Sequence, residues 1–408
     1  MKSRIHWAWV ILVCSFITVF TNYSIRLGYG ILMPEMIISL RITKAQAGAI
    51  ASSFYLTYTI FSPLVGFLVD RLSARTLITF FSFILAGGTF LMHMPDSLFQ
   101  AGLFFGIVGM GSSAMWTPVV TVVQRWFGVR RRGMVLGILS MSYTLGYGIM
   151  GLALPPLVGR YEWRACWLAL SGLAFALVPL NAAFLRSRPQ EMDRSPWGDE
   201  SPVRPRISSG QTQPRVRYGE LLQVRNLWLV GISYFFIGFT AYVVNTFIVT
   251  YGNMELQFPF AQAAQLASAI AFSGMAGALF IPMLSDFLGR KKCLILINSS
   301  MAASILLIIW AGKNWAILLP AVCLFGVFYA AAWPMYAAAA ADFFPLGATG
   351  SVLGFWTIFY GLGVILSPSL GGYIADLTGT FTWSFLMAAL TGAVATFFLS
   401  RITEPTFN

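Results

Sequence analysis

Long apolar runs alternate along the chain with short polar or charged segments. There are twelve such runs, and each is close to the roughly 20 residues that a helix needs to cross the hydrocarbon core of a bilayer. The runs of the first half lie at about 8–33, 45–68, 76–93, 98–124, 133–158 and 164–185. The runs of the second half lie at about 226–251, 262–285, 293–311, 315–341, 350–374 and 381–399. The pattern predicts an all-α membrane protein with twelve transmembrane helices.

One segment interrupts this pattern. Residues 186–225 are rich in Arg, Pro, Ser and Gln, and they contain almost no apolar run. Polar segments of this kind connect periodic segments without adding to a core. We therefore expect a six-helix half at 1–185, a cytoplasmic linker at 186–225 and a second six-helix half at 226–408.

Composition supports a membrane protein and excludes several other classes. The chain is 58% hydrophobic and only 10% charged, whereas soluble domains carry about 25% charged residues. This excludes a soluble enzyme, a nucleic-acid-binding domain and a disordered chain. The four cysteines and the two histidines are scattered and form no ligand spacing, so we expect neither a metal site nor a cofactor. They are Cys14, Cys166, Cys293, Cys323, His6 and His93.

The basic residues predict the orientation. With the N-terminus inside, twenty of the 26 Lys and Arg residues fall on the cytoplasmic side, five fall outside, and Arg26 falls within a span. Cytoplasmic loops of membrane proteins carry this excess of positive charge. We expect both termini in the cytoplasm and the protein in the cytoplasmic (inner) membrane. The net charge of +12 then follows from topology and implies no nucleic-acid partner.

The two halves repeat each other. A shift of 217 residues places 100–159 on 317–376 without a gap, so that Gly109 meets Gly326 and Trp116 meets Trp333. A shift of 219 places Arg26 on Asn245. Parallel repeats of six spans are typical of secondary transporters, in which the substrate binds near the membrane midplane at the repeat interface. The repeat therefore predicts two pseudo-symmetric halves and a transport function.

Arg26 is the charge that lies well inside a predicted span, whereas the acids fall in loops, in the linker or near span ends. An arginine at the centre of a helix costs about 2.5–3.5 kcal/mol on insertion scales, and such a residue is a functional candidate. Its guanidinium suits bidentate binding of an organic anion. The alternative is that Arg26 extends to the outer membrane surface near Met33, about 10 Å away by helix rise.

Polar and aromatic residues of other spans are candidate companions of Arg26 in a substrate cavity, because a tyrosine hydroxyl in a span needs a partner. In the first half they are Asn22, Tyr23, Tyr29, Tyr55, Tyr58, Trp116, Thr117, Tyr143 and Tyr147. In the second half they are Tyr242, Asn245, Tyr329, Trp333, Tyr336 and Tyr360.

Two loops resemble the signature of the major facilitator superfamily: GFLVDRLSAR at 66–75 and its second-half copy PMLSDFLGRK at 282–291. The resemblance covers essentially the whole chain and implies the major facilitator fold and alternating access. An acid stands at the same place in both copies, so we expect a charge cluster that closes a cytoplasmic gate. Its members would be Asp70, Arg71, Arg75, Asp286, Arg290 and Lys291. The alternative is a solvated basic loop.

Three further motifs resemble the monocarboxylate porter and oxalate–formate antiporter branch of this superfamily. They are HWAWVI at 6–11, RLGYGILMP at 26–34 and RRGMVLG at 131–137. The resemblance implies transport of a small organic anion, with a monocarboxylate as the expected substrate. The cationic residues of that branch in the eighth and eleventh spans are absent here. A proton symporter generally needs a titratable group in the pathway, and no acid or histidine lies well inside a predicted span. We therefore favour anion exchange or uniport over proton symport.

The alternatives are a multidrug exporter of the same superfamily and a non-transporting membrane sensor. A cationic drug usually needs an acid in the membrane, and a sensor needs a signalling domain. No arrangement of nucleophile and base, of paired acids or of metal ligands indicates an enzyme. The expected partners are the lipid bilayer, a small organic anion, and a proton or counter-anion for coupling. We expect a monomer.

Overall fold

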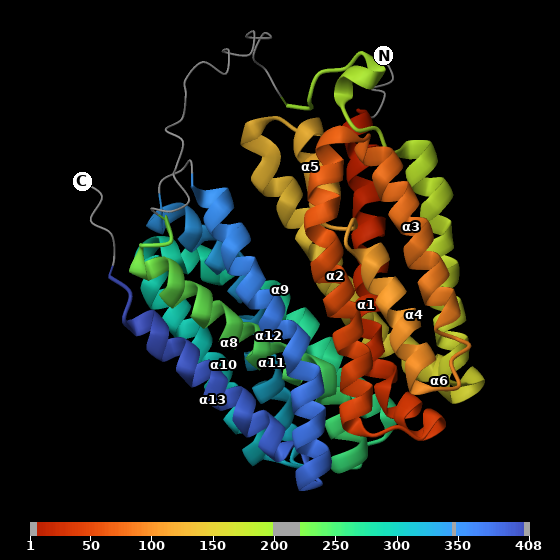
Figure 1. Cartoon of the computed structure of the whole chain (residues 1–408), viewed down its shortest axis with the longest axis vertical. Coiled ribbons are helices and arrows are strands. Elements are labelled where there is room, and N and C mark those ends of the chain that lie inside the picture. The colour runs from red at the N-terminus through yellow and green to blue at the C-terminus, as the bar shows by residue number, and fades with distance from the viewer. Residues whose placement is uncertain (1–5, 199–220, 345–347, 404–408) are drawn as a thin grey trace. The chain divides into compact units, whose positions relative to one another are not determined.

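The computed structural model describes residues 6–198, 221–344 and 348–403, apart from the side chains of Asp70 and Val129, and this part is helical almost throughout (Figure 1). The first helices are α1 (Trp7–Leu40), α2 (Lys44–Arg71), α3 (Ala74–Leu91), α4 (Leu98–Ser112), α5 (Thr117–Trp126) and α6 (Arg132–Phe184), with short turns η1 (Val129–Arg131) and η2 (Pro189–Met192). The later ones are α8 (Arg225–Thr250), the π-helical η3 (Tyr251–Glu255), α9 (Phe260–Leu288), α10 (Arg290–Ala311), α11 (Trp315–Phe343), α12 (Thr349–Thr378) and α13 (Phe381–Ser400).

Eleven helical segments of this described part are long and apolar enough to cross a membrane. The longest, α6, contains two of the twelve predicted spans. Glu162 (φ 66°, ψ 169°) breaks the helical geometry inside α6, at the boundary that the sequence predicts between 158 and 164. The prediction of an all-α membrane protein is confirmed.

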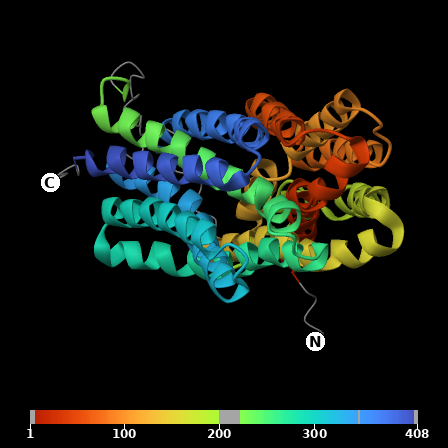
Figure 2. The ribbon, with the colours of Figure 1, turned by 90° about the horizontal axis from the view of Figure 1, so that it is seen from below.

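The chain divides into two compact units. One comprises Met1–Ile42 and Ala49–Pro202, and the other comprises Thr43–Gly48 and Val203–Asn408. Within the first unit α1 packs along α6, and within the second unit α8 packs along α12. Helices α8 to α13 lie side by side as a bundle, which Figure 2 shows from below.

The same close approach of helices recurs in both units. A Cβ atom added at Gly146 of α6 would lie 2.6 Å from the carbonyl oxygen of Phe20 of α1. At the repeat position, a Cβ atom added to Gly363 of α12 would collide with the carbonyl oxygen of Phe235 of α8. Glycine lets two membrane helices approach this closely because it has no side chain. The sequence repeat is therefore also a repeat of packing.

Helix α1 is longer than the sequence pattern predicts. The predicted run ends near Met33, but the helix continues to Leu40, and the amide of Arg41 bonds to the carbonyl of Ile37. Pro34 does not end the helix, because membrane helices tolerate an internal proline when neighbouring groups satisfy the backbone. As a result Glu35 lies within α1 and is half-buried.

A buried polar chain joins three helices of the first unit. The hydroxyl of Thr18 (α1) donates to the side-chain oxygen of Asn181 (α6) at 3.0 Å. The amide nitrogen of Asn181 donates to the hydroxyl of Ser82 (α3) at 3.1 Å. Asn181 is fully buried, so these bonds satisfy polar atoms that would otherwise be costly to bury.

The start of the predicted linker packs on the first unit. The amide of Trp197 donates to the carbonyl of Trp126 at 2.9 Å, and the amide of Gly128 donates to the carbonyl of Trp197 at 3.0 Å. The indole ring of Trp197 lies 5.0 Å from that of Trp9 and 5.8 Å from the ring of Phe127. Trp197 therefore anchors this part of the chain to the ends of α1 and α5.

His6 caps the start of α1 nearby. Its Nδ1 accepts a hydrogen bond from the amide of Ala8 at 3.2 Å, and its ring lies edge-on to Trp126. Burial, and to a lesser degree the charge of Arg194, lower the pKa of His6 below its usual value. The neutral imidazole is therefore the form that caps the helix.

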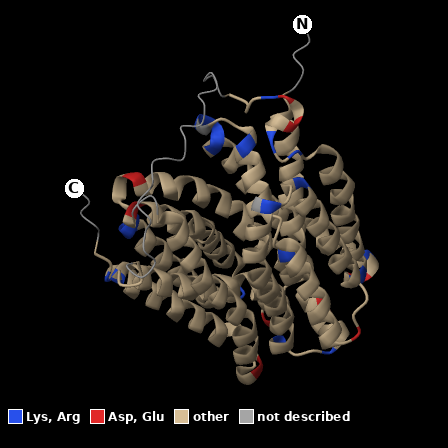
Figure 3. Cartoon of the chain, turned by 45° about the horizontal axis from the view of Figure 1, so that its top comes forward, with Lys and Arg blue, Asp and Glu red and all other residues tan. Residues whose placement is uncertain are grey.

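Charged residues gather mostly at helix ends and in connecting segments, while the helix bodies are largely uncharged (Figure 3). This is the distribution that a bilayer imposes, because charged side chains within its core are costly. Arg26 is an exception, since it lies in the body of α1.

Candidate functional site

Arg26 is surrounded by aromatic rings. Only 8% of the residue is exposed. Its guanidinium carbon lies 5.4 Å from the ring centre of Tyr23 on α1. It also lies 5.6 Å from Phe54, 5.1 Å from Tyr55 and 5.2 Å from Tyr58 on α2. We call these four rings the Arg26 cage.

The cage has a local origin in the helix period. Tyr23 and Arg26 are three residues apart on α1, and Phe54 and Tyr58 are four residues apart on α2, so each pair shares a helix face. A cation within about 6 Å of an aromatic ring centre is attracted to the ring face, by up to about 2 kcal/mol when desolvated. Because the rings carry no charge, they hold the guanidinium inside the protein without neutralising it.

Rings from α6 and from the start of α5 contact the Arg26 cage. The ring of Tyr23 lies 4.5 Å from that of Tyr143 and 6.3 Å from that of Trp116. Both partners are half-buried. The structure therefore brings six of the residues predicted for the first half, including Arg26, into one connected group. Thr117, which follows Trp116 at the start of α5, is exposed.

Three other predicted residues of the first half are deeply buried. The side-chain oxygen of Asn22 and the hydroxyl of Tyr147 have no hydrogen-bond partner among the described residues. Tyr29 stacks on Phe105 at 4.5 Å, a contact that belongs to the core. Asn22 and Tyr147 are thus buried polar groups whose hydrogen bonding is incomplete within the described part of the chain.

The second unit has its own cluster of tyrosines. The ring of Tyr234 stacks on Tyr336 at 4.2 Å and on Tyr360 at 4.6 Å. The hydroxyls of Tyr336 and Ser233 are 2.5 Å apart, and the amide of Asn298 donates to the hydroxyl of Tyr336 at 3.3 Å. Two predicted residues, Tyr336 and Tyr360, therefore belong to one group.

The remaining predicted residues of this unit are more dispersed. Tyr242 contacts Tyr360 edge-on at 6.2 Å. Asn245 is buried and donates to the carbonyl of Ala241, one turn earlier on α8. Tyr329 stacks on Phe325 within α11 at 5.9 Å, and Trp333 is 43% exposed.

Sequence reasoning missed four residues of these groups: Phe54, Ser233, Tyr234 and Asn298. Phe54 has no polar atom, so it gave no signal in a search for polar groups in spans. The same search would have found Tyr234 and Asn298, because both lie in the middle of predicted apolar runs.

Two of the predicted gating residues of the second unit, Asp286 and Arg290, form an ion pair. Arg290 bonds to Asp286 at 2.8 Å and to Asp342 at 2.7 Å, and it also bonds to the hydroxyl of Ser285. Lys291 donates to the carbonyl of Ile402 at 2.6 Å. Asp342, at the end of α11, is an additional member that the loop motif does not contain.

The corresponding loop of the first unit is described less completely. The side chain of Asp70 lies outside the described part of the structure. Arg71 is exposed and lies over the ring of Phe67 at 4.0 Å. The amide of Arg75 donates to the hydroxyl of Ser187 at 3.1 Å. The role of these residues in a gate stays a prediction.

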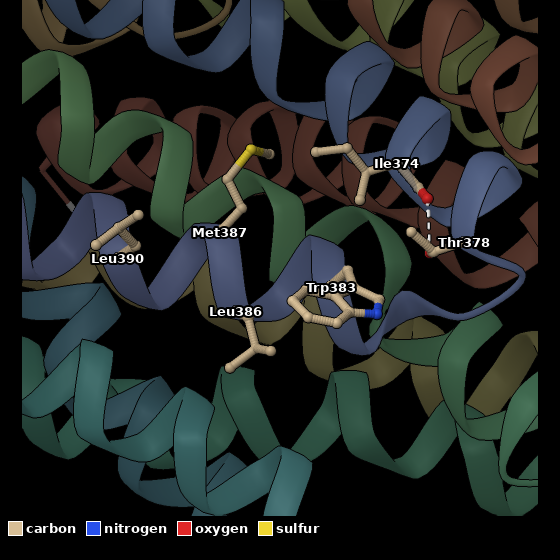
Figure 4. A pocket seen from close by; sticks show the side chains of 6 residues that line it. All are labelled: Ile374, Thr378, Trp383, Leu386, Met387 and Leu390. Carbon is tan, nitrogen blue, oxygen red and sulfur yellow. Dashed lines mark hydrogen bonds between the residues drawn. The ribbon is translucent and has the colours of Figure 1, made fainter.

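An apolar groove of about 360 Å³ lies on the outer face of α12 and α13. Figure 4 shows its lining by Ile374, Thr378, Trp383, Leu386, Met387 and Leu390. Its polar atoms are the hydroxyl of Thr378, which donates to the carbonyl of Ile374, and the indole nitrogen of Trp383. Such a mostly apolar surface suits lipid chains.

A family comparison identifies the fold. The model of the Major Facilitator Superfamily matches residues 11–286 and 255–407. The chain belongs to the major facilitator superfamily. It is therefore an integral multi-pass membrane transporter and not an enzyme, as the loop motifs predict. No group of His, Cys, Asp and Glu in the described residues could hold a metal ion.

The chain is similar over nearly its full length to several curated members. It is 24% identical to the "Hexuronate transporter" of Bacillus subtilis, over 94% of this chain and 92% of that protein. It is 21% identical to the "Probable sulfoacetate transporter SauU" of Cupriavidus necator, over 98% and 96%. It is 24% identical to "Monocarboxylate transporter 13" of Rattus norvegicus, over 94% and 86%.

Solved structures show the same fold. The nucleoside transporter NupG superposes with a TM-score of 0.76 at 17% identity, over 98% of this chain and 100% of that chain. A bacterial homolog of the human lysosomal transporter Spinster superposes with a TM-score of 0.74 at 14% identity, over 98% and 96%. At these identities the likeness concerns the fold alone.

Proposed function

We propose that this protein transports a small organic anion across the cytoplasmic membrane by alternating access, and that Arg26 binds the acid group of that anion. The observation that carries the proposal is the position of Arg26: it is buried in the body of a membrane-spanning helix and held by the Arg26 cage. A protein bears the cost of such a charge where it serves a substrate or ion pathway.

The geometry suits an acid group. A guanidinium presents several N–H donors in a plane and binds a carboxylate or sulfonate by two parallel hydrogen bonds. The edge-on contacts of Tyr23 with Tyr143 and Trp116 give the group an apolar wall, in which a charge-assisted hydrogen bond is stronger than in water.

The relatives support the same substrate class. Their names specify hexuronate, sulfoacetate and monocarboxylates, and all of these are organic anions. Within this class we propose a monocarboxylate, because the sequence provides a single arginine well inside a span.

For coupling we propose anion exchange or uniport. Arginine stays protonated at all physiological pH values, so Arg26 itself cannot carry a proton in a transport cycle. The nearest acid along α1 is Glu35, nine residues or about 14 Å away along the helix axis. Uptake into proteoliposomes that requires a pH gradient, and loses this requirement in Glu35→Gln, would contradict the proposal.

Binding can be tested on the purified protein by thermal shift against monocarboxylates, dicarboxylates, sulfonates and cationic drugs. We expect stabilisation by one class of anion in the wild type and none in Arg26→Gln. Arg160→Gln is the matched control, because Arg160 is exposed and lies over a single ring, that of Tyr161, at 5.3 Å. Stabilisation by cationic drugs, or by anions equally in both variants, would favour the exporter function.

We also propose the orientation, with both termini in the cytoplasm. The positive charge of the predicted inner loops supports it. Labelling of single cysteines introduced at positions 129 and 313 with a membrane-impermeant reagent tests it in intact cells. Only the residue at 313 should react.

A further inference from the structure

The first turn of α2 is held by a side chain of another helix. The carboxylate of Asp376, near the end of α12, accepts hydrogen bonds from the amide of Lys44 at 3.0 Å and from the amide of Ala45 at 2.8 Å. The first N–H groups of a helix have no partner within the helix, and the helix dipole favours a negative charge beside them. Asp376 therefore caps α2, although 331 residues separate it from Ala45 in the chain.

The neighbouring amides of this turn are satisfied within α2 and its flank. The amide of Thr43 donates to the side-chain oxygen of Gln46 at 2.9 Å, and the amide of Gln46 donates to the hydroxyl of Thr43 at 3.2 Å. Such a reciprocal pair is a capping box. Asp376 thus supplies the two acceptors that the local sequence does not, and the first turn depends on α12 for them.

Glycines bring the two backbones together at the same place. A Cβ atom added at Gly48 of α2 would collide with the carbonyl oxygen of Pro368 on α12. One added at Gly372 of α12 would collide with the carbonyl oxygen of Lys44. The Nζ atom of Lys44 also lies 4.6 Å from the ring centre of Phe381 at the start of α13. The contact is therefore close and depends on the absence of side chains at both glycines.

The chain changes unit at this contact. Thr43–Gly48 belong with α12 to the second unit, whereas the residues before them and the rest of α2 from Ala49 belong to the first. Helix α2 nevertheless runs as one helix from Lys44 to Arg71. One bundle of a secondary transporter rocks against the other during transport. Such a movement must either bend α2 after Gly48 or release its first turn from α12.

The contact is built in a way that permits release. Asp376 is exposed, and Lys44 and Ala45 are only half-buried. Water can therefore replace each hydrogen-bond partner when the contact opens, so that no buried polar atom is left without a partner. A capping bond of this kind contributes a small part of the stability of a protein. It can bias an equilibrium between two states without fixing the protein in one of them.

We propose that Asp376 is a latch of the transport cycle: its carboxylate holds the first turn of α2 on α12 in one state and releases it in the other. The inference rests on the alternating access of the proposed function. It depends neither on Arg26 nor on the chemistry of the substrate. Asp376 thereby sets the balance between the two states without contacting the transported molecule.

The test measures the distance between the two units in the absence of any substrate. The four natural cysteines are replaced by alanine, and spin labels are attached to Tyr161→Cys in the first unit and Lys313→Cys in the second. Both positions are exposed, and double electron–electron resonance gives the distribution of distances between the labels. We expect Asp376→Asn to raise the ratio of longer to shorter distances about five- to tenfold, the size of one helix cap. Asparagine lacks the charge and turns an N–H donor toward one of the two amides.

Two further variants separate the latch from the stability of the helix end. Gln46→Ala is the matched control, because it removes an acceptor from the same turn of α2 and leaves both bonds to Asp376 in place. It should leave the ratio of distances unchanged. Gly372→Ala places a methyl group against the carbonyl of Lys44, and it should raise the ratio as Asp376→Asn does.

Two results would overturn the inference. An unchanged ratio in Asp376→Asn would mean that the first turn of α2 stays on α12 throughout the cycle. An equal shift in Gln46→Ala would mean that the effect comes from the end of the helix and not from its bond to α12. Failure of the proposed function is visible separately, because the distances are measured without a substrate. If carboxylates bind Arg26→Gln as well as the wild type while Asp376→Asn shifts the distances, the anion proposal fails and the latch stands.

Discussion

Replacing Gly363 with alanine tests the packing of the second unit. A methyl group at this position would collide with the carbonyl oxygen of Phe235 on α8, and backbone cannot rotate away as a side chain can. Gly354 lies on the same helix, α12, and a methyl group there meets nothing within 4 Å. Gly354→Ala is therefore the matched control.

The two variants should change stability in opposite directions. Glycine in a helix costs about 0.5–1 kcal/mol relative to alanine, so Gly354→Ala should stabilise by up to that amount. Forcing an extra methyl group into a packed contact costs about 1–3 kcal/mol. After the same helix gain is subtracted, Gly363→Ala should destabilise by up to about 2.5 kcal/mol. The two free energies of unfolding should then differ by about 1–3 kcal/mol.

The assay is the melting temperature of the purified protein in detergent. For a domain of 150–250 residues, 1 kcal/mol shifts the melting temperature by about 2–4 °C. We expect Gly363→Ala to melt about 2–12 °C below Gly354→Ala. The repeat predicts that Gly146→Ala likewise melts below Gly137→Ala in the first unit. A methyl group added at Gly137 also meets nothing within 4 Å. Equal melting temperatures within each pair would refute the close helix contacts.

Three further changes test other parts of the account. Acidification through about pH 6.5, the usual pKa of histidine, should lower the stability of the protein. The pKa of His6 is lowered in the folded protein, so the folded state favours the neutral imidazole. In melting curves between pH 7.5 and 5.5, His6→Asn should remove this loss. Asn181→Leu removes the Asn181 partner of the buried hydroxyls of Thr18 and Ser82 and should lower the free energy of unfolding by about 1–3 kcal/mol. Thermal melting measures this change, and an unchanged value would contradict the polar chain. Trp197→Ala should make Arg194 accessible to limited trypsin digestion, whereas a cleavage rate equal to that of the wild type would show that the indole does not anchor this segment.

The helices were largely predictable from the sequence. Apolar runs of bilayer length define spans almost directly, because a backbone in lipid must satisfy its own hydrogen bonds. The predicted helix boundary is wrong where this rule does not determine the end of a helix. Pro34 and Glu35 interrupt the apolar pattern of the first run but not the helix. The fifth and sixth predicted spans both lie within α6, and the non-helical backbone of Glu162 separates them as predicted.

The candidate site was predictable only in part. Arg26 is evident from the sequence because a charge in a span is costly. Its surroundings depend on how α2 is rotated about its axis, and packing against neighbouring helices sets that rotation. Phe54 was missed because it has no polar atom. The place of Thr117 in the site stays a prediction, since it begins α5 and is exposed. The contacts of Tyr336 with Tyr234 and with Asn298 likewise depend on the packing of α8 and α10 against α11.

The central claim is that the charge of Arg26 binds the acid group of the substrate, and a double-mutant cycle measures this most directly. Dissociation constants of a bound carboxylate and of its uncharged amide are compared in wild type and Arg26→Gln by calorimetry. We predict that the carboxylate binds the wild type at least about 30-fold more tightly than Arg26→Gln, as for other buried charge pairs, while the amide binds both proteins alike. If carboxylate and amide lose the same affinity in Arg26→Gln, Arg26 does not contact the acid group and the account is wrong.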